Sequence, residues 1–409
     1  MKYIFFLVTS LIYSASFSQN PICDGSRFLN PDFQVLSTTG VVFGNATTFG
    51  GVNSDLKMDI FEPMNDNAQA RPVIILAYGG SFISGAREDL HDFCDYYAQR
   101  GYVCATIDYR LYDGAFFPFP DSLDFTDVVI KAVSDMKAAV RFFREDASTV
   151  NTFKIDQNLI FVGGISAGGI VASHVGFLDA TDPIQPFIDP ILIANGGFDG
   201  NSSTNTQYSS DVAGVINFSG GLKDAIYIDA ADPPLFSVHD DGDDVVPYQS
   251  GSASVFGIDI IYMQGSGPMH ARANNVGVNN ELHTIANSAA HVSYFQTPNG
   301  TNDILAKSLD FLYPIVCPQF AGINYKELDD FKIYPNPVVE QLVVEMNGSV
   351  GVNEVSLILY DMMGRVVLEE QMNANKNIFN VNALQSGTYI ASIIDGSGVE
   401  QESQLVIVD

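Results

Sequence analysis

The segment 161–169, FVGGISAGG, restricts what this chain can fold into more than any other part of its sequence. An apolar run at 159–162 leads into Gly-x-Ser-x-Gly around Ser166, and a second apolar run with Ile170 and Val175 follows. This order predicts a buried strand, a tight turn and a helix, with glycines where a Cβ atom would clash. The Ser166 hydroxyl would then project at the helix N-terminus, where free N–H groups favour negative charge. A strand–helix turn with an incidental serine is the alternative interpretation.

A second glycine turn follows an earlier apolar strand signal. Residues 72–77 read PVIILA, and the sequence YGGSF comes directly after them. Two glycines after a buried strand allow backbone N–H groups to face a ligand. If this turn lies beside Ser166, the amides of Gly80, Ser81 and Ala167 would form a site for an oxyanion. Taken alone, the segment is more typical of a plain glycine turn, and its place beside the Ser166 turn favours the oxyanion interpretation.

A candidate for the carboxylate of a catalytic triad follows a late strand signal. Residues 234–238 read PLFSV, and HDDGDDVVP follows. A triad needs a carboxylate that orients the imidazole, on a loop after a late strand. Asp243 is the predicted acid, although the spacing leaves Asp240, Asp241 and Asp244 open. A calcium loop is a further alternative, but the spacing does not match Asp-x-Asp-x-Asp-Gly.

The candidate base is one of three histidines that follow the acidic segment. His283 lies in an alternating strand pattern, and His270 opens a helix-like run. His291 follows a loop of small residues after the last strand signal, which is the expected place for the imidazole of a triad. His291 is therefore the predicted base. His91 and His174 precede the acidic segment and are interpreted as packing or surface residues.

Strand and helix signals alternate along most of the chain. The predicted helix 126–144 has apolar residues at three- and four-residue steps, which indicates one face packed on a sheet. Alternation of this kind predicts a mostly parallel α/β sheet with right-handed crossovers, flanked by helices. The predicted strands are 41–43, 56–61, 74–78, 102–108, 159–162, 212–219, 235–239 and 281–285, and the other predicted helices are 90–99 and 304–316.

These motifs together resemble the α/β-hydrolase superfamily, and more narrowly secreted bacterial carboxylesterases and the lipase and feruloyl-esterase-like branch. The YGGSF turn, DYRL at 108–111, GISAGG at 164–169 and the acidic segment carry the resemblance, which covers about residues 25–320. The resemblance implies Ser166 as nucleophile, Asp243 as acid and His291 as base. It also implies an oxyanion hole from the three amides named above, and no metal or organic cofactor.

The N-terminus and the four cysteines indicate an exported protein. Residues 1–18 have a basic start, a short apolar core and small residues at the end, which is typical of a signal peptide. A buried N-terminal strand is the alternative, and the apolar core is too short to span a bilayer in the mature chain. Export favours disulfides. The predicted pairs are Cys23 with Cys317, and Cys94 with Cys104; no spacing suggests zinc.

The composition changes near residue 324, and short strand patterns follow the sequence YPNP at 334–337. Turn signals separate strands predicted at 341–346, 355–360, 365–368, 378–381, 388–393 and 404–408, which indicates a small antiparallel β-sandwich. This segment resembles the C-terminal sorting domain of bacterial type IX secretion, which implies contact with the secretion machinery. A carbohydrate-binding sandwich is the alternative. The predicted domains are a signal peptide (1–18), a hydrolase domain (19–322), a linker (323–330) and a sorting domain (331–409).

The charge of the chain excludes two classes of partner. It has 48 Asp and Glu against 19 Lys and Arg, a net charge of −29. Nucleic-acid binding needs clustered cations, and attachment to anionic lipid needs a cationic face. Neither is expected here.

Residues 182–210 form a Pro-, Asn-, Ser- and Gly-rich segment that also contains apolar side chains such as Phe187, Leu192 and Phe198. It comes after the predicted helix that follows Ser166. A cap over the site and a long ordered loop both fit this pattern. As a cap, it would line an acyl or aromatic pocket.

The resemblance implies a secreted or cell-surface serine carboxylic-ester hydrolase that works through an acyl-enzyme intermediate. The expected substrate is a small-molecule or polymer-linked ester, for example acetyl or feruloyl groups on polysaccharide. A lipase or polyester hydrolase, a peptidase on the same triad and a non-catalytic surface protein are the alternatives.

Overall fold

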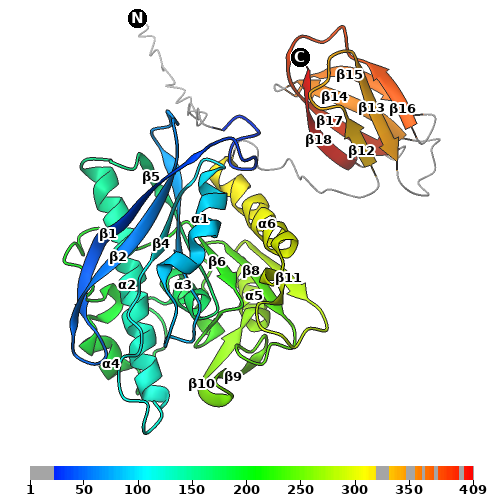
Figure 1. The fold of residues 1–409 in the computed structure, drawn as a ribbon. Helices are drawn as coiled ribbons and strands as arrows, with labels where there is room; N and C mark the ends of the chain where they lie inside the picture. The colour runs from blue at the N-terminus through cyan, green and yellow to red at the C-terminus, as the bar shows by residue number, and fades with distance from the viewer. Residues whose placement is uncertain are drawn as a thin grey trace, which may run out of the picture.

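A computed structural model describes residues 23–318, 331–346, 355–361, 364–372, 376–395 and 400–408. The predicted signal peptide, 1–18, and the predicted linker, 323–330, lie outside the described residues. We call residues 23–318 the N-terminal unit and the described residues from 331 onward the C-terminal unit (Figure 1).

Strands and helices alternate in the N-terminal unit, as the sequence predicts. Its strands are β1 (Val35–Thr47), β2 (Asn53–Pro63), β3 (Arg71–Ala77), β4 (Val103–Ile107), β5 (Ile155–Ile165), β6 (Gly214–Phe218), β7 (Gly221–Leu222), β8 (Leu235–Asp240), β9 (Ser250–Val255), β10 (Ile258–Gly265) and β11 (Asn280–Ile285). Its helices are α1 (His91–Ala98), α2 (Ser122–Ser148), α3 (Ala167–Phe177), α4 (Asp189–Ala194), α5 (Ser266–Val276) and α6 (Pro298–Val316), and short 3-10 turns are η1 (Arg87–Leu90), η2 (Gly197–Asp199), η3 (Ala225–Tyr227) and η4 (Ser293–Phe295).

Eight strands form one sheet in the order β1-β2-β4-β3-β5-β6-β8-β11. The pairs β1–β2 and β2–β4 are antiparallel, and every later pair is parallel. The prediction of a mostly parallel α/β sheet is therefore confirmed. Because parallel strands end at the same edge, the loops after β3, β5 and β8 meet at one edge of the sheet.

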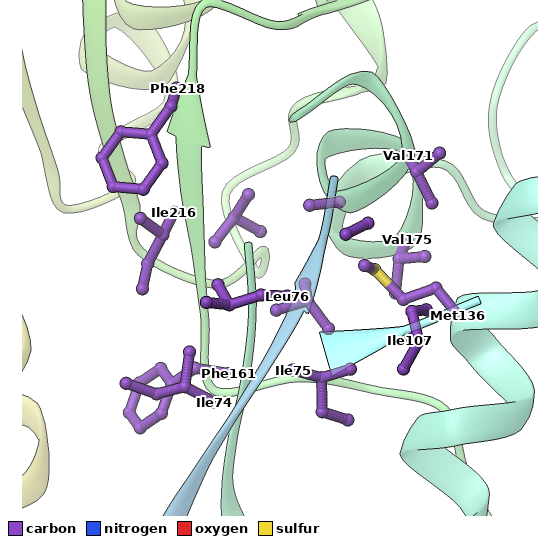
Figure 2. Packing of buried hydrophobic residues seen from close by; sticks show 14 of the residues in the cluster. Ile74, Ile75, Leu76, Ile107, Met136, Phe161, Val171, Val175, Ile216 and Phe218 are labelled. Atoms are coloured by element: carbon purple, nitrogen blue, oxygen red, sulfur yellow. The ribbon is translucent and has the colours of Figure 1, made fainter. Parts of the chain in front are cut away.

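The core lies on both faces of the central strand β3, which is buried throughout. Successive side chains of a strand point to opposite faces. Figure 2 shows Ile75 on the side of Met136 of α2, whereas Ile74 lies with Phe161 on the other side. Helices α2 and α3 cover the first face, and α1 and α6 cover the second, where the hydroxyls of Tyr97 and Ser308 are 2.7 Å apart (Figure 1).

Several elements were not predicted. Strands β7, β10 and β9 form a second, small antiparallel sheet. Helix α4 and the 3-10 turn η2 lie within the 182–210 segment. The hairpin between β9 and β10 turns at Phe256 and Gly257, which both have positive φ, at 53° and 77°. The alternating pattern at 252–255 and the glycine turn were the available signal.

The structure joins Cys23 to Cys317 by a disulfide with a Cα–Cα distance of 5.9 Å. The predicted second disulfide is wrong. Cys94 on α1 and Cys104 on β4 are free thiols whose sulfur atoms are 3.1 Å apart, in hydrogen-bond contact. Both are fully buried, and burial raises the pKa of the Cys104 thiol well above its usual value. The thiolate that oxidation requires is therefore disfavoured.

The C-terminal unit is a small antiparallel β-sandwich, as predicted. One sheet has the order β12-β13-β16 and the other β15-β14-β17-β18. Buried residues of both sheets, such as Val344 and Leu357, form one apolar cluster. Each predicted strand overlaps an observed one, and β12 was not predicted. The strands are β12 (Phe331–Tyr334), β13 (Gln341–Met346), β14 (Val355–Asp361), β15 (Val366–Gln371), β16 (Lys376–Asn380), β17 (Gly387–Asp395) and β18 (Glu400–Val408).

Among the described residues, no helix is both long enough and apolar enough to cross a membrane.

Candidate active site

Ser166 stands on a sharp turn between β5 and α3. Its backbone has φ 56° and ψ −116°, a conformation that L-residues rarely adopt, and its side chain is mostly buried. The turn requires its glycines: a Cβ atom on Gly168 would lie 2.0 Å from the Ala77 carbonyl oxygen, and one on Gly164 would lie 2.4 Å from the carbonyl carbon of Gly168. The Gly-x-Ser-x-Gly pattern is thus explained by backbone contact with β3.

His291 and Asp243 reach Ser166 from two separate loops. His291 Nε2 lies 2.8 Å from Ser166 Oγ, and His291 Nδ1 lies 2.7 Å from Asp243 Oδ2. With Nδ1–H donating to the carboxylate, Nε2 is left to accept the hydroxyl proton of Ser166. The Asp243 side chain is fully buried, and that of His291 is 19% exposed. The structure thus brings the three predicted triad residues together.

The neighbouring carboxylates that the spacing left open have other partners. Asp240 accepts hydrogen bonds from the backbone and the hydroxyl of Ser293, and Asp241 accepts from the amide of Ser288 at 3.1 Å. Asp244 is exposed. Asp240 and Asp241 therefore hold the loop that carries His291 from both sides. Because the carboxylates face different partners, they do not converge on one point as a calcium loop would require.

Asp243 is held as a carboxylate by its surroundings. Burial alone would raise the pKa of Asp243, but contacts with His239 and His291 and backbone N–H groups hold it well below its usual value. The amides of Val245 and Val246 donate to Oδ1 at 2.9 and 3.0 Å, and His239 Nε2 lies 3.3 Å from Oδ2. His239 is buried and its role was not predicted. Its position three residues before Gly242, within the acidic segment, was the only signal.

The predicted oxyanion turn lies against Ser166. Gly79 approaches Ser166 closely, since a Cβ built on Gly79 would be 3.3 Å from the Cβ of Ser166. Gly80 has φ 123°, and a Cβ atom there would lie 2.1 Å from the Ser84 carbonyl oxygen. Ser81 lines the same pocket as Ser166. Among the described residues, the backbone N–H groups of Gly80, Ser81 and Ala167 have no hydrogen-bond partner, so they are available to a ligand.

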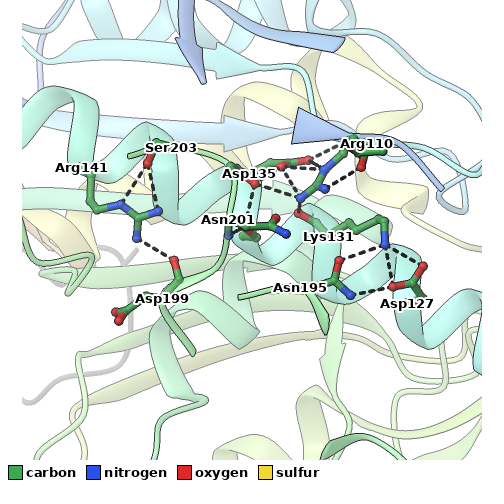
Figure 3. A network of polar contacts seen from close by, with 12 residues as sticks. Arg110, Asp127, Lys131, Asp135, Arg141, Asn195, Asp199, Asn201 and Ser203 are labelled. Atoms are coloured by element: carbon green, nitrogen blue, oxygen red, sulfur yellow. Dashed lines mark hydrogen bonds and ion pairs between the residues drawn. The ribbon is translucent and has the colours of Figure 1, made fainter. Parts of the chain in front are cut away.

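The DYRL segment supports this turn from behind. The Tyr109 hydroxyl donates to the Tyr78 carbonyl at 2.9 Å, and the two rings stack with centroids 4.4 Å apart. The buried carboxylate of Asp135, on α2, binds the Arg110 side chain, and Arg110 Nε lies 3.0 Å from Asp135 Oδ1 (Figure 3). The turn is therefore anchored to the helix that lines the pocket described next.

The remaining histidines do not contact Ser166. His239, on β8, has been described with Asp243. Each of the others has its own partner: His91 with Asp59, His174 with the Ile170 carbonyl, His270 with Asn280 and His283 with Glu281.

An apolar pocket opens at Ser166 and runs between α2, α3 and the β9–β10 hairpin. The 182–210 segment closes one side of it through Ile184, Ile188, Leu192 and Phe198. This segment lies on α2 and acts as a cap in the sense that it walls the pocket.

Basic side chains of α2 and the DYRL segment fasten the cap (Figure 3). They donate to its backbone carbonyls and polar side chains, so the cap is held by directed hydrogen bonds as well as by apolar contact. The donors and acceptors are Arg110 with Ser202, Lys131 with Asn195, Lys137 with the Phe198 carbonyl and Arg141 with the Asp199 carbonyl, each at 2.9 Å.

Comparison with known families agrees with both units. Residues 58–223 match the BD-FAE family, and residues 332–408 match the secretion system C-terminal sorting domain. The N-terminal unit therefore has an α/β-hydrolase fold, and the C-terminal unit matches a secretion sorting domain. The sorting domain marks the hydrolase as a secreted or cell-surface protein and implies interaction with the type IX secretion machinery.

Individual relatives are esterases by name. The hydrolase is 29% identical over 127 residues to Esterase LipC of Mycobacterium tuberculosis (strain ATCC 25618 / H37Rv), a match that covers 31% of this chain and only 28% of that protein. Thermogutta terrifontis esterase 2 phosphorylated by paraoxon has a TM-score of 0.50 at 21% identity, over 68% of this chain and 94% of that one. Its apo form has a TM-score of 0.49 at 21% identity, over 70% and 95%. At this identity the first structure supports the shared fold.

Within the described residues, no group of three or more His, Cys, Asp or Glu side chains could hold a metal ion.

Proposed function

We propose that this α/β hydrolase is a secreted serine carboxylesterase whose nucleophile is Ser166. One observation carries the proposal. Asp243, His291 and Ser166 form a continuous chain of hydrogen bonds of 2.7 and 2.8 Å, beside three backbone N–H groups that have no partner in the described part of the chain. This is the arrangement that generates and stabilises a tetrahedral intermediate in acyl transfer.

In the acylation step, Ser166 Oγ attacks the ester carbonyl while His291 Nε2 takes the hydroxyl proton. The carbonyl oxygen gains negative charge, which the amides of Gly80, Ser81 and Ala167 would accept. The imidazolium then gives its proton to the leaving alcohol, and the C–O bond breaks. Water repeats the sequence on the acyl-enzyme, so that the acid is released and Ser166 is regenerated.

The pocket receives the acyl group in this proposal. The leaving oxygen must lie near His291 Nε2, because that atom returns the proton. The pocket is lined by Ser166, Ser81 and Ala167 but by no residue of the loop 286–292 that carries His291. The alcohol therefore departs on the His291 side, and the acyl chain extends between α2 and α3.

Paraoxon provides a direct test of the nucleophile. Attack by Ser166 Oγ forms an O–P bond and expels 4-nitrophenolate, which leaves a diethylphosphoryl group on the serine. Peptide mass spectrometry should find one such group per chain, on the peptide with Ser166, and none in Ser166→Ala. Ser173→Ala, a change of a buried serine on the same helix, is the matched control and should still be labelled. Labelling at another residue, or equal labelling of Ser166→Ala, would refute the proposal.

A series of 4-nitrophenyl esters from acetate to palmitate separates the finer alternatives. Hydrolysis confined to short and medium acyl chains supports a carboxylesterase, whereas a maximum at palmitate favours a lipase or polyester hydrolase. Faster cleavage of a peptide 4-nitroanilide than of any ester would favour a peptidase. Equal, slow product release by wild type and Ser166→Ala would favour a non-catalytic surface protein.

A further inference from the structure

The acyl pocket has a charge opposite to that of the whole chain. The protein carries 48 acidic and 19 basic residues, yet the lining of the pocket contains no Asp or Glu. It contains two lysines, Lys137 of α2 and Lys223. The rest of its wall is mostly apolar, with Phe125, Val129 and Val133 preceding Lys137 along one side of α2. A pocket whose lining has lysines but no Asp or Glu favours a ligand that carries a negative charge at one end.

Lys137 is the buried cation of this pocket. Its residue is 7% exposed, and its Nζ donates at 2.9 Å to the Phe198 carbonyl, its only hydrogen-bond partner among the described residues. Lys131, on the same helix, contacts both carboxylate oxygens of Asp127 at 2.7 Å and also the Asn195 side chain. Lys137 has no ion pair within 4.0 Å in the described part of the chain, so two of its three N–H donors lack a partner. Asp199, Asp211 and Asp179 act on its charge only from farther away.

Lys137 lies toward the end of the pocket that is remote from the nucleophile. His174, which also lines the pocket, is eight residues beyond Ser166 on α3, or about 12 Å at 1.5 Å per residue. Burial lowers the pKa of His174 to about 4, and the charges of Lys223 and Lys137 both contribute to the shift. The apolar walls between Ser166 and Lys137 would therefore contact the body of an acyl chain, and the ammonium its end.

Two other polar side chains at this end, those of His174 and Ser134, already have hydrogen-bond partners. His174 Nδ1 donates to the Ile170 carbonyl at 2.8 Å, and its Nε2 accepts from the Lys223 amide at 3.1 Å. The Ser134 hydroxyl lies 2.6 Å from that of Ser202.

Lys223 Nζ donates to the Tyr262 carbonyl at 2.8 Å and lies 5.7 Å from the centre of the Phe187 ring. Of the two lysines, Lys137 is the more deeply buried.

We propose that the pocket selects acyl groups that carry a carboxylate at the far end of an apolar spacer, with Lys137 as the residue that binds the carboxylate. This inference rests on the proposed esterase function. A neutral acyl chain would leave the buried ammonium without a directly bonded counter-charge, whereas a terminal carboxylate would form a charge-assisted hydrogen bond with it in an apolar pocket. The substrates would be monoesters of dicarboxylic acids.

The test compares esters of equal acyl length with and without the terminal carboxylate. Mono-4-nitrophenyl esters of adipic, suberic and sebacic acid are measured against 4-nitrophenyl hexanoate, octanoate and decanoate. For wild type, kcat/KM should favour the carboxylate ester at one length or more. In Lys137→Met, which keeps the apolar stem, the ratio of carboxylate to neutral ester should fall on the order of tenfold or more. Lys307→Met, on α6 away from the pocket lining, is the control and should keep the wild-type ratio.

The outcomes separate this inference from the proposed function. If wild type hydrolyses no ester of either series, the esterase proposal fails. If it hydrolyses neutral esters and disfavours the carboxylate at every length, or if Lys137→Met keeps the ratio, only the role of Lys137 fails. A stronger preference for methyl ferulate than for any carboxylate ester would also overturn it. Should Lys137→Met not fold, inactive Ser166→Ala serves instead, because suberate monoester should raise its melting temperature more than the octanoate ester does.

Discussion

Replacement of Asp243 by Asn tests the proposed triad most sharply, because the surrounding contacts fix the orientation of the new amide. Oδ1 accepts from the amides of Val245 and Val246 at 2.9 and 3.0 Å. In Asp243→Asn the amide oxygen must stay on those two donors, since its NH₂ group would meet them donor to donor. The NH₂ group therefore replaces Oδ2 and faces His291 Nδ1.

This geometry changes the tautomer of the His291 imidazole. The NH₂ group can only donate, so His291 Nδ1 must accept, and the ring proton moves to Nε2. Nε2 lies 2.8 Å from Ser166 Oγ and then has no lone pair to take the hydroxyl proton. In Ser–His–Asp triads this substitution lowers kcat by about 10⁴-fold, which corresponds to about 5.4 kcal/mol in the activation barrier. We expect a loss of that size here, with KM little changed.

The assay is hydrolysis of 4-nitrophenyl butyrate, together with the rate of labelling by paraoxon, which should fall in parallel. The matched control is Asp244→Asn, one residue along the same segment, where the side chain is exposed. It should retain nearly full activity. Near-UV circular dichroism and thermal melting establish that both variants are folded. A loss of less than tenfold in Asp243→Asn, or an equal loss in Asp244→Asn, would refute the assignment of the acid.

Three further predictions concern the framework around this site. Gly168→Ala places a Cβ atom 2.0 Å from a backbone carbonyl oxygen of β3, so it should abolish activity and lower the melting temperature, whereas Gly267→Ala, whose Cβ would have no neighbour closer than 3.1 Å, should have little effect on either. Replacing Cys23 and Cys317 together by Ser frees a loop of 294 residues and should lower the free energy of unfolding by about 5 kcal/mol in urea titrations; no change would contradict the chain-entropy argument. Burial alone would raise the pKa of Asp66, but hydrogen bonds from two arginines and a backbone amide lower it to about 2; this carboxylate therefore stabilises the fold above about pH 4, and the stability it supplies is lost as the pH falls to 2, a dependence that should be weaker in Asp66→Asn.

The parts of the site that could be predicted are those with a signature in a short stretch of sequence. The turn at Ser166 is visible because Gly164 and Gly168 stand on either side of the serine, although the backbone atom closest to a Cβ on Gly168 belongs to Ala77 of β3. His291 could be singled out because it comes after the acidic segment and follows a loop of small residues. Asp243 could be placed only within a group of four carboxylates, because the sequence does not show that Asp240 and Asp241 hold the His291 loop instead.

The parts that could not be predicted depend on segments that meet only after folding. Cys94 and Cys104 were expected to be bonded, and proximity was right, but covalent bonding does not follow from proximity in a buried, apolar site. His239 contacts Asp243 only because the loop after β8 folds back over the strand. The β9–β10 hairpin was not predicted, although its first strand has an alternating pattern and a glycine turn follows.

The position of the pocket depends on contacts of the same kind, as α2 shows. Its apolar stripe indicated the face that packs on the sheet, and the sequence indicated no partner for the polar residues between. In the structure Lys137 and Arg141 are buried, because the 182–210 segment folds onto that second face and receives their hydrogen bonds. Helix α2 therefore fixes both the position of the cap and the wall of the pocket. In the proposed function the catalytic residues lie in short motifs that a single sequence displays, whereas the acyl pocket depends on how this helix packs against its cap. Substitutions along α2 should consequently change which ester is preferred while leaving the contacts among Ser166, His291 and Asp243 intact.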